Sequence, residues 1–172
     1  MQQLQALRQR AGLMHLDIIG TALQRHSAEE GHQAAVVELG ASLQGMRSLT
    51  CLHLQFWKLQ SATAVTTLAS ALQLLTQLQH LHISRLGAAR VAALTPALSG
   101  MRGLETLDVC NNPVNGAEGA MALCTLLDAV PGLTHLDVNS DRLWDEGAAL
   151  LAPVLRGMTC LQTLNLNDTG TS

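Results

Sequence analysis

One pattern, Leu-x-x-Leu-x-(Leu, Ile or Val), returns throughout the 172-residue chain. Its six occurrences begin at Leu13, Leu49, Leu78, Leu104, Leu133 and Leu161, so that the starts lie 36, 29, 26, 29 and 28 residues apart. A further leucine stands six residues before every start, and another stands ten residues before each of the last five. Columns that stay aligned over such a period indicate tandem copies of one supersecondary unit, in a single domain spanning residues 1–172.

Each unit is predicted to contain a short strand and a helix. The last two apolar residues of the pattern are two apart, which places them on one side of a strand. The apolar positions thirteen, ten and six residues before the later starts follow the spacing of an amphipathic helix. Neither element can bury its apolar side alone, so the units stack with their strands paired in parallel. We therefore expect an α/β fold, a right-handed solenoid whose concave sheet has about six strands and whose convex side carries the helices.

The composition excludes several classes of partner and setting. The formal net charge is −3 and Lys and Arg are not clustered, so the basic surface that nucleic acid or an anionic membrane needs is missing. No stretch approaches the roughly 18 apolar residues of a membrane-spanning helix. The four cysteines, Cys51, Cys110, Cys124 and Cys160, show no paired spacing, which is typical of free thiols in a reducing compartment. We expect a cytoplasmic protein that binds neither nucleic acid nor membrane.

The stretch Leu107–Gly119, which reads LDVCNNPVNGAEG, resembles the ribonuclease-inhibitor-like subclass of leucine-rich repeats. Units of that subclass have about 28 to 29 residues and a full helix, and the resemblance covers essentially the whole chain. It implies a horseshoe-shaped molecule, an intracellular setting and the binding of another protein. Members of the subclass include a ribonuclease inhibitor, a GTPase-activating protein and the sensor regions of innate immune receptors.

The predicted function is therefore a non-catalytic protein–protein interaction module that needs no cofactor. The sequence offers no nucleophile with a base and an orienting group at defined spacing, so we expect no enzyme activity. Two alternatives stay open. The chain is a ligand-sensing or autoinhibitory segment of a larger receptor or regulator, or it is a GTPase-activating type of regulator, by analogy with the relatives.

The family pattern asks for Asn or Cys at the ninth position of each unit, where the side chain bonds the backbone of the turn that leaves the strand. In order, these positions hold Thr21, Trp57, Leu86, Asn112, Asp141 and Thr169. Trp57 and Leu86 cannot supply the acceptor, and buried backbone donors without partners are costly. We therefore expect an irregular or water-filled turn at these two positions.

The ends of the sequence carry no polar capping unit of the kind that closes repeat proteins. We therefore expect this chain to be a fragment of a longer protein. An exposed terminal strand of such a fragment can pair edge to edge with a second copy.

The concave face is predicted to bind the partner, and its residues come from the third, fifth, seventh and eighth positions of each unit. Five of the seven histidines stand at these positions. The surface is polar and mildly acidic, which favours a basic or mixed partner, and Phe56 beside Arg85 is a candidate anchor. The candidate partner-binding residues are His15, Asp17, His53, Gln55, Phe56, His80, His82, Arg85, Asp108, Asn111, His135, Asp137 and Asn139.

The histidines and aspartates of the first four strands suggest two further properties. Cys51, His53, His80 and His82 are the donors of a candidate zinc site. Against a metal stands the lack of closed ligand spacing, so the favoured interpretation is a solvated surface that contacts the partner. Histidines beside aspartates also predict that partner affinity changes between about pH 5 and pH 7.

Overall fold

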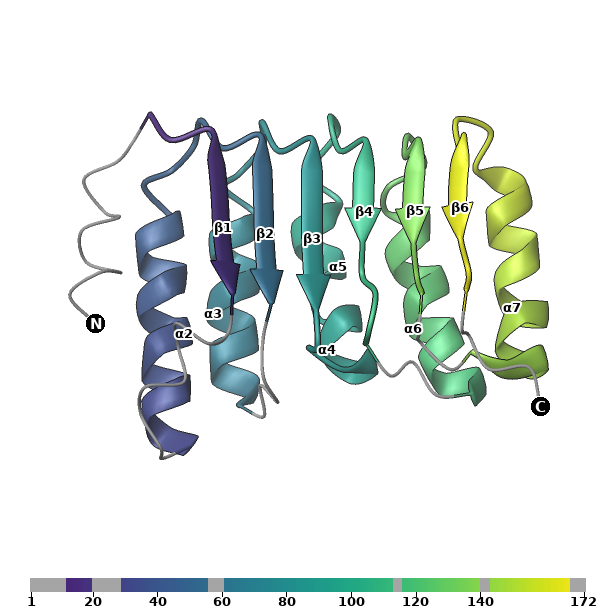
Figure 1. Ribbon diagram of the computed structural model, residues 1–172, viewed down its shortest axis with the longest axis horizontal. Helices are drawn as coiled ribbons and strands as arrows, with labels where there is room; N and C mark the ends of the chain where they lie inside the picture. The colour runs from purple at the N-terminus through teal and green to yellow at the C-terminus, as the bar shows by residue number, and fades with distance from the viewer. Residues whose placement is uncertain (1–11, 20–28, 56–60, 113–115, 140–142, 168–172) are drawn as a thin grey trace.

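The computed structural model describes residues 12–19, 29–55, 61–112, 116–139 and 143–167, and it contains a six-stranded sheet (Figure 1). Consecutive strands pair in parallel, in the order in which they occur in the chain. The strands are β1 (His15–Ile19), β2 (Cys51–Gln55), β3 (His80–Ser84), β4 (Thr106–Asp108), β5 (His135–Asp137) and β6 (Thr163–Asn165). The predicted α/β class and the predicted parallel sheet are confirmed.

Helices connect the strands and lie together on one side of the sheet, behind the strands in the view of Figure 1. They are α2 (Glu29–Leu43), α3 (Ala62–Leu72), α4 (Ala88–Ala92), α5 (Thr95–Leu98), α6 (Gly116–Asp128) and α7 (Trp144–Gly157). The connection between β3 and β4 has two short helices in place of the single one predicted. Pro96 stands at the start of α5, where its missing N–H removes no intrahelical hydrogen bond.

The core fills the space between the sheet and the helices. Along β2, Leu52 and Leu54 are fully buried, while Cys51, His53 and Gln55 alternate with them on the opposite face and are partly exposed. Of the leucines six residues before each start, Leu43, Leu72, Leu98 and Leu127 are buried and Leu155 is partly buried. Burial weakens at the last strand, since Leu164 is 40% exposed whereas its counterpart Leu107 is 1% exposed. The periodicity thus predicted the core, which is complete between β2 and β5.

The turn that follows β3 differs from the one predicted at Leu86. Asn112 is fully buried, and its Oδ1 accepts hydrogen bonds from the backbone N–H of Leu86 at 2.6 Å and of Gly87 at 3.0 Å. Its Nδ2 donates to the carbonyl oxygen of Ile83 at 2.8 Å and also to that of Val109. The expectation of an irregular or water-filled turn at Leu86 rested on a missing acceptor, and that premise is wrong, because Asn112 of the next unit supplies the acceptor. The Trp57 turn lies outside the described residues.

Leu86 itself occupies the ninth position as a core residue. It is 2% exposed and belongs to the same apolar cluster as the strand leucines. The ninth position thus holds a buried apolar side chain in this unit, whereas in the next unit it holds Asn112, which hydrogen-bonds the backbone of the turns.

Among the described residues, no helix is both long enough and apolar enough to cross a membrane.

Candidate functional site

The face of the sheet opposite the helices, called the open face here, carries polar side chains in two rows. The strand register aligns the third positions of the units as His15, Cys51, His80, Thr106, His135 and Thr163. It aligns the fifth positions as Asp17, His53, His82, Asp108, Asp137 and Asn165. Both rows match the predicted columns. No described helix covers this face (Figure 1).

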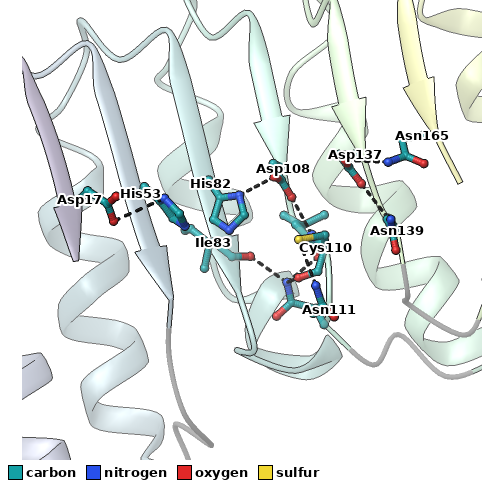
Figure 2. A network of polar contacts seen from close by, with 12 residues as sticks. Asp17, His53, His82, Ile83, Asp108, Cys110, Asn111, Asp137, Asn139 and Asn165 are labelled. Atoms are coloured by element: carbon teal, nitrogen blue, oxygen red, sulfur yellow. Dashed lines mark hydrogen bonds and ion pairs between the residues drawn. The ribbon is translucent and has the colours of Figure 1, made fainter. Parts of the chain in front are cut away.

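Four fifth-position side chains from four neighbouring strands form a continuous line, which we call the Asp–His row: Asp17, His53, His82 and Asp108 (Figure 2). Asp17 Oδ1 lies 3.4 Å from His53 Nδ1. The rings of His53 and His82 meet edge to face, with centroids 3.9 Å apart and planes at 65°. His82 Nδ1 then forms a hydrogen bond with Asp108 Oδ2. Two imidazoles are thus held between two carboxylates across β1 to β4.

Beyond the Asp–His row, the fifth-position side chains of β5 and β6 accept hydrogen bonds from the backbone at the ends of their own strands. Asp137 Oδ1 accepts from the backbone N–H of Asn139 at 2.9 Å, and Asn165 Oδ1 accepts from that of Asn167 at 3.1 Å. Asn165 Nδ2 also donates to Asp137 Oδ2 at 2.8 Å, so neighbouring strands are linked. Such bonds to the residue two positions on are typical of Asp and Asn where a strand gives way to a turn. These side chains therefore shape the open face as well as line it.

Asp108 and Cys110 influence each other at the centre of the open face. The backbone N–H of Cys110 donates to Asp108 Oδ1 at 2.9 Å. Burial raises the pKa of the Cys110 thiol to about 12, and the neighbouring Asp108 carboxylate adds to that rise. Burial would also raise the pKa of Asp108, but hydrogen bonds from His82 and Cys110 outweigh it and leave the pKa below its usual value. At neutral pH the pair is therefore a carboxylate and a protonated thiol.

The other predicted residues fall into three groups. His80 Nδ1 lies 3.0 Å from Thr106 Oγ1 and His135 Nδ1 lies 2.8 Å from Thr134 Oγ1, and both histidines are exposed. Exposed Arg85 and Asn111 have positive φ angles of 62° and 57°, so both stand at the sharp bend after a strand. His15 begins β1, Gln55 ends β2, and Phe56 lies outside the described residues.

The structure gathers metal-ligating side chains differently from the predicted set. Within the described ranges, the atoms of His82, Asp108 and Cys110 that could bind a metal all lie within 4.8 Å of one another. That group includes neither Cys51 nor His80 nor His53. The sequence placed Cys110 on this face but gave no reason to join it with His82, since the contact depends on side-chain conformation. All four cysteines are free thiols, as predicted.

Comparisons with known proteins add no family name to this geometry. No protein-family model matches the sequence, and no curated protein matches it. The functional argument therefore depends on the molecule's own residues.

Cys110 should react unusually slowly with aromatic disulfide reagents. A rise of its pKa from 9.0 to about 12 lowers the thiolate fraction. Because a more basic thiolate is also a better nucleophile, the net slowing at pH 8 is about 30-fold. Exposed Cys160 is the internal reference, and mass spectrometry distinguishes the two sites. Asp108→Asn should raise the Cys110 rate at least about threefold, because it removes the negative charge. Equal rates at Cys110 and Cys160 in the wild-type protein would contradict this account.

The same thiol should make stability fall at alkaline pH. Its pKa is higher in the folded chain, so the stabilisation is fully present below about pH 9 and is lost as pH rises toward about 12. The chain has no tyrosine to obscure this range. We expect urea midpoints to decline from pH 9 upward, and to decline less steeply in Cys110→Ser. Some slope should persist in that variant, because burial also raises the pKa of Cys124. If the urea midpoints of the wild type and of Cys110→Ser fell equally steeply above pH 9, Cys110 would not be the cause of the loss of stability.

Proposed function

We propose that this chain is a leucine-rich-repeat solenoid of the ribonuclease-inhibitor-like kind, and that it binds a protein partner on its open face without catalysing a reaction. The observation that carries the proposal is that none of the described helices covers one face of the all-parallel sheet. Parallel sheets are normally covered on both faces. Here the helices lie on one face, and the other presents rows of half-buried and exposed polar side chains. A surface of this kind can accommodate a partner across several strands.

The chemistry of the open face favours a basic or mixed partner. Asp17 contributes a carboxylate that is 60% exposed, and the exposed imidazoles of His80 and His135 add hydrogen-bonding groups in the neighbouring row of third positions. Lys and Arg side chains on a partner would complement the carboxylates, and complementary charge chiefly sets specificity and association rate. Free thiols fit an intracellular setting for this interaction.

The proposal is tested by exchanging charge on each side of the sheet. We expect Asp17→Lys combined with His135→Lys to weaken capture of the natural partner at least tenfold, because both positions are exposed on the open face. The matched control is Met121→Lys combined with Asp128→Lys, which makes the same charge change at exposed positions of α6. Loss of the partner only in the α6 variant would overturn the proposal.

A further inference from the structure

The half-buried group His82, Asp108 and Cys110 joins three kinds of donor atom at one point of the open face. His82 belongs to β3 and lies opposite Asp108 of β4 in the strand register. Cys110 follows Asp108 by two residues, which is the spacing of neighbours on the same face of an extended chain. All three side chains are partly buried. An imidazole nitrogen, a carboxylate and a sulfur thus converge within 4.8 Å (Figure 2).

Hydrogen bonds already hold these donors in place. Asp108 Oδ2 is hydrogen-bonded to His82 Nδ1, and Asp108 Oδ1 accepts a hydrogen bond from the backbone N–H of Cys110. Asn111 Nδ2 donates to Cys110 Sγ at 3.3 Å, which orients the thiol from the other side. An ion would replace the His82–Asp108 hydrogen bond with bonds to the metal. Donor atoms around zinc lie closer together than 4.8 Å, so the three donors would have to approach one another only slightly.

We propose that His82, Asp108 and Cys110 form a binding site for a divalent transition-metal ion of the zinc class. Nitrogen, oxygen and sulfur donors together select zinc or cobalt over magnesium or calcium, which prefer oxygen alone. Three protein ligands leave a fourth position for water or for a donor from a partner. Binding takes the proton from the Cys110 thiol, since the thiolate is the ligand. The site does not depend on the proposed protein interaction.

Neighbouring positions on the open face provide a natural contrast. At β5 and β6 the corresponding side chains are Asp137, Asn139 and Asn165, which offer oxygen and amide groups but no thiol or imidazole. On β2, Cys51 also lies on this face, yet it is not part of the convergent group within the described ranges. Mixed donors therefore meet where β3 adjoins β4.

Cobalt(II) titration of the chelator-treated protein tests the site directly. We expect one equivalent of Co²⁺ to produce a thiolate-to-cobalt charge-transfer band, and Zn²⁺ but not excess Mg²⁺ to remove it. Cys110→Ser should abolish the band, and His82→Ala or Asp108→Asn should weaken Co²⁺ binding at least about tenfold. Cys51→Ser and His80→Ala are the matched controls on the same face, and both should bind as the wild type does.

Three results would overturn the proposal. The first is a wild-type protein without the charge-transfer band. The second is a band that survives in Cys110→Ser, and the third is a band that disappears in Cys51→Ser, which would place the ion among the second- and third-strand donors. A second measurement avoids any effect of substitution on folding: Zn²⁺ should slow the modification of Cys110 in the wild-type protein at least tenfold relative to Cys160. Equal rates with and without Zn²⁺ would count against the site.

Discussion

Asn112→Leu should lower the free energy of unfolding by about 3 to 5 kcal/mol, which is a large share of the total for a domain of this size. Asn112 is fully buried and its side chain hydrogen-bonds the backbone of two turns. It accepts from the N–H groups of Leu86 and Gly87. It donates to the carbonyl oxygens of Ile83 and Val109. Leucine has the same branched arrangement of four side-chain heavy atoms, although it is bulkier, and it leaves these backbone groups without partners in the core. Urea denaturation followed by circular dichroism measures the loss.

A second variant at Asn112 and a control at Asn167 separate hydrogen bonding from packing. Asn112→Asp keeps the shape but turns a carboxylate oxygen toward the carbonyls of Ile83 and Val109, so it should destabilise about as much as leucine. Asn167→Leu alters an exposed asparagine and should change stability by less than about 0.5 kcal/mol. If Asn112→Leu matched the Asn167 control, the buried amide would not be supporting the turns.

Leu107→Ala should cost about 3 kcal/mol, whereas Leu164→Ala should cost less than about 1 kcal/mol. Both leucines occupy the same position in their strands, but Leu107 is 1% exposed and Leu164 is 40% exposed. The comparison therefore holds the residue type and the position constant while burial changes. Urea midpoints of the two variants, measured at several protein concentrations, give the result. Equal losses would show that the side chain of Leu164 is covered in solution.

The sequence predicted the strands, the register and the apolar columns because these follow from spacing alone. Every fifth-position residue from Asp17 to Asn165 lies where the repeat placed it. The error at Leu86 arose because each turn was judged by the residue at its own ninth position. In the folded chain the acceptor for this turn is the side chain of Asn112, which belongs to the next unit.

The contacts between side chains on the open face could not be predicted from the sequence, because they depend on side-chain conformation. Position decides which side chains share a face, but rotamers decide which of them touch. The edge-to-face contact of His53 with His82, and the grouping of His82 with Asp108 and Cys110, depend on such choices. The same holds for the hydrogen bond that Asp137 Oδ1 accepts from the backbone N–H of Asn139.

We propose that the partner binds the open face and not the helical side of the sheet. Histidine-ring resonances in the complex test it most directly, because His15, His53, His80, His82 and His135 all lie on that face. The methyl group of exposed Met121 on α6 reports on the helical side. We expect the captured partner to shift or broaden several of these five imidazole signals and to leave the Met121 methyl unchanged. Five unchanged imidazoles with a shifted Met121 methyl would contradict the proposed function.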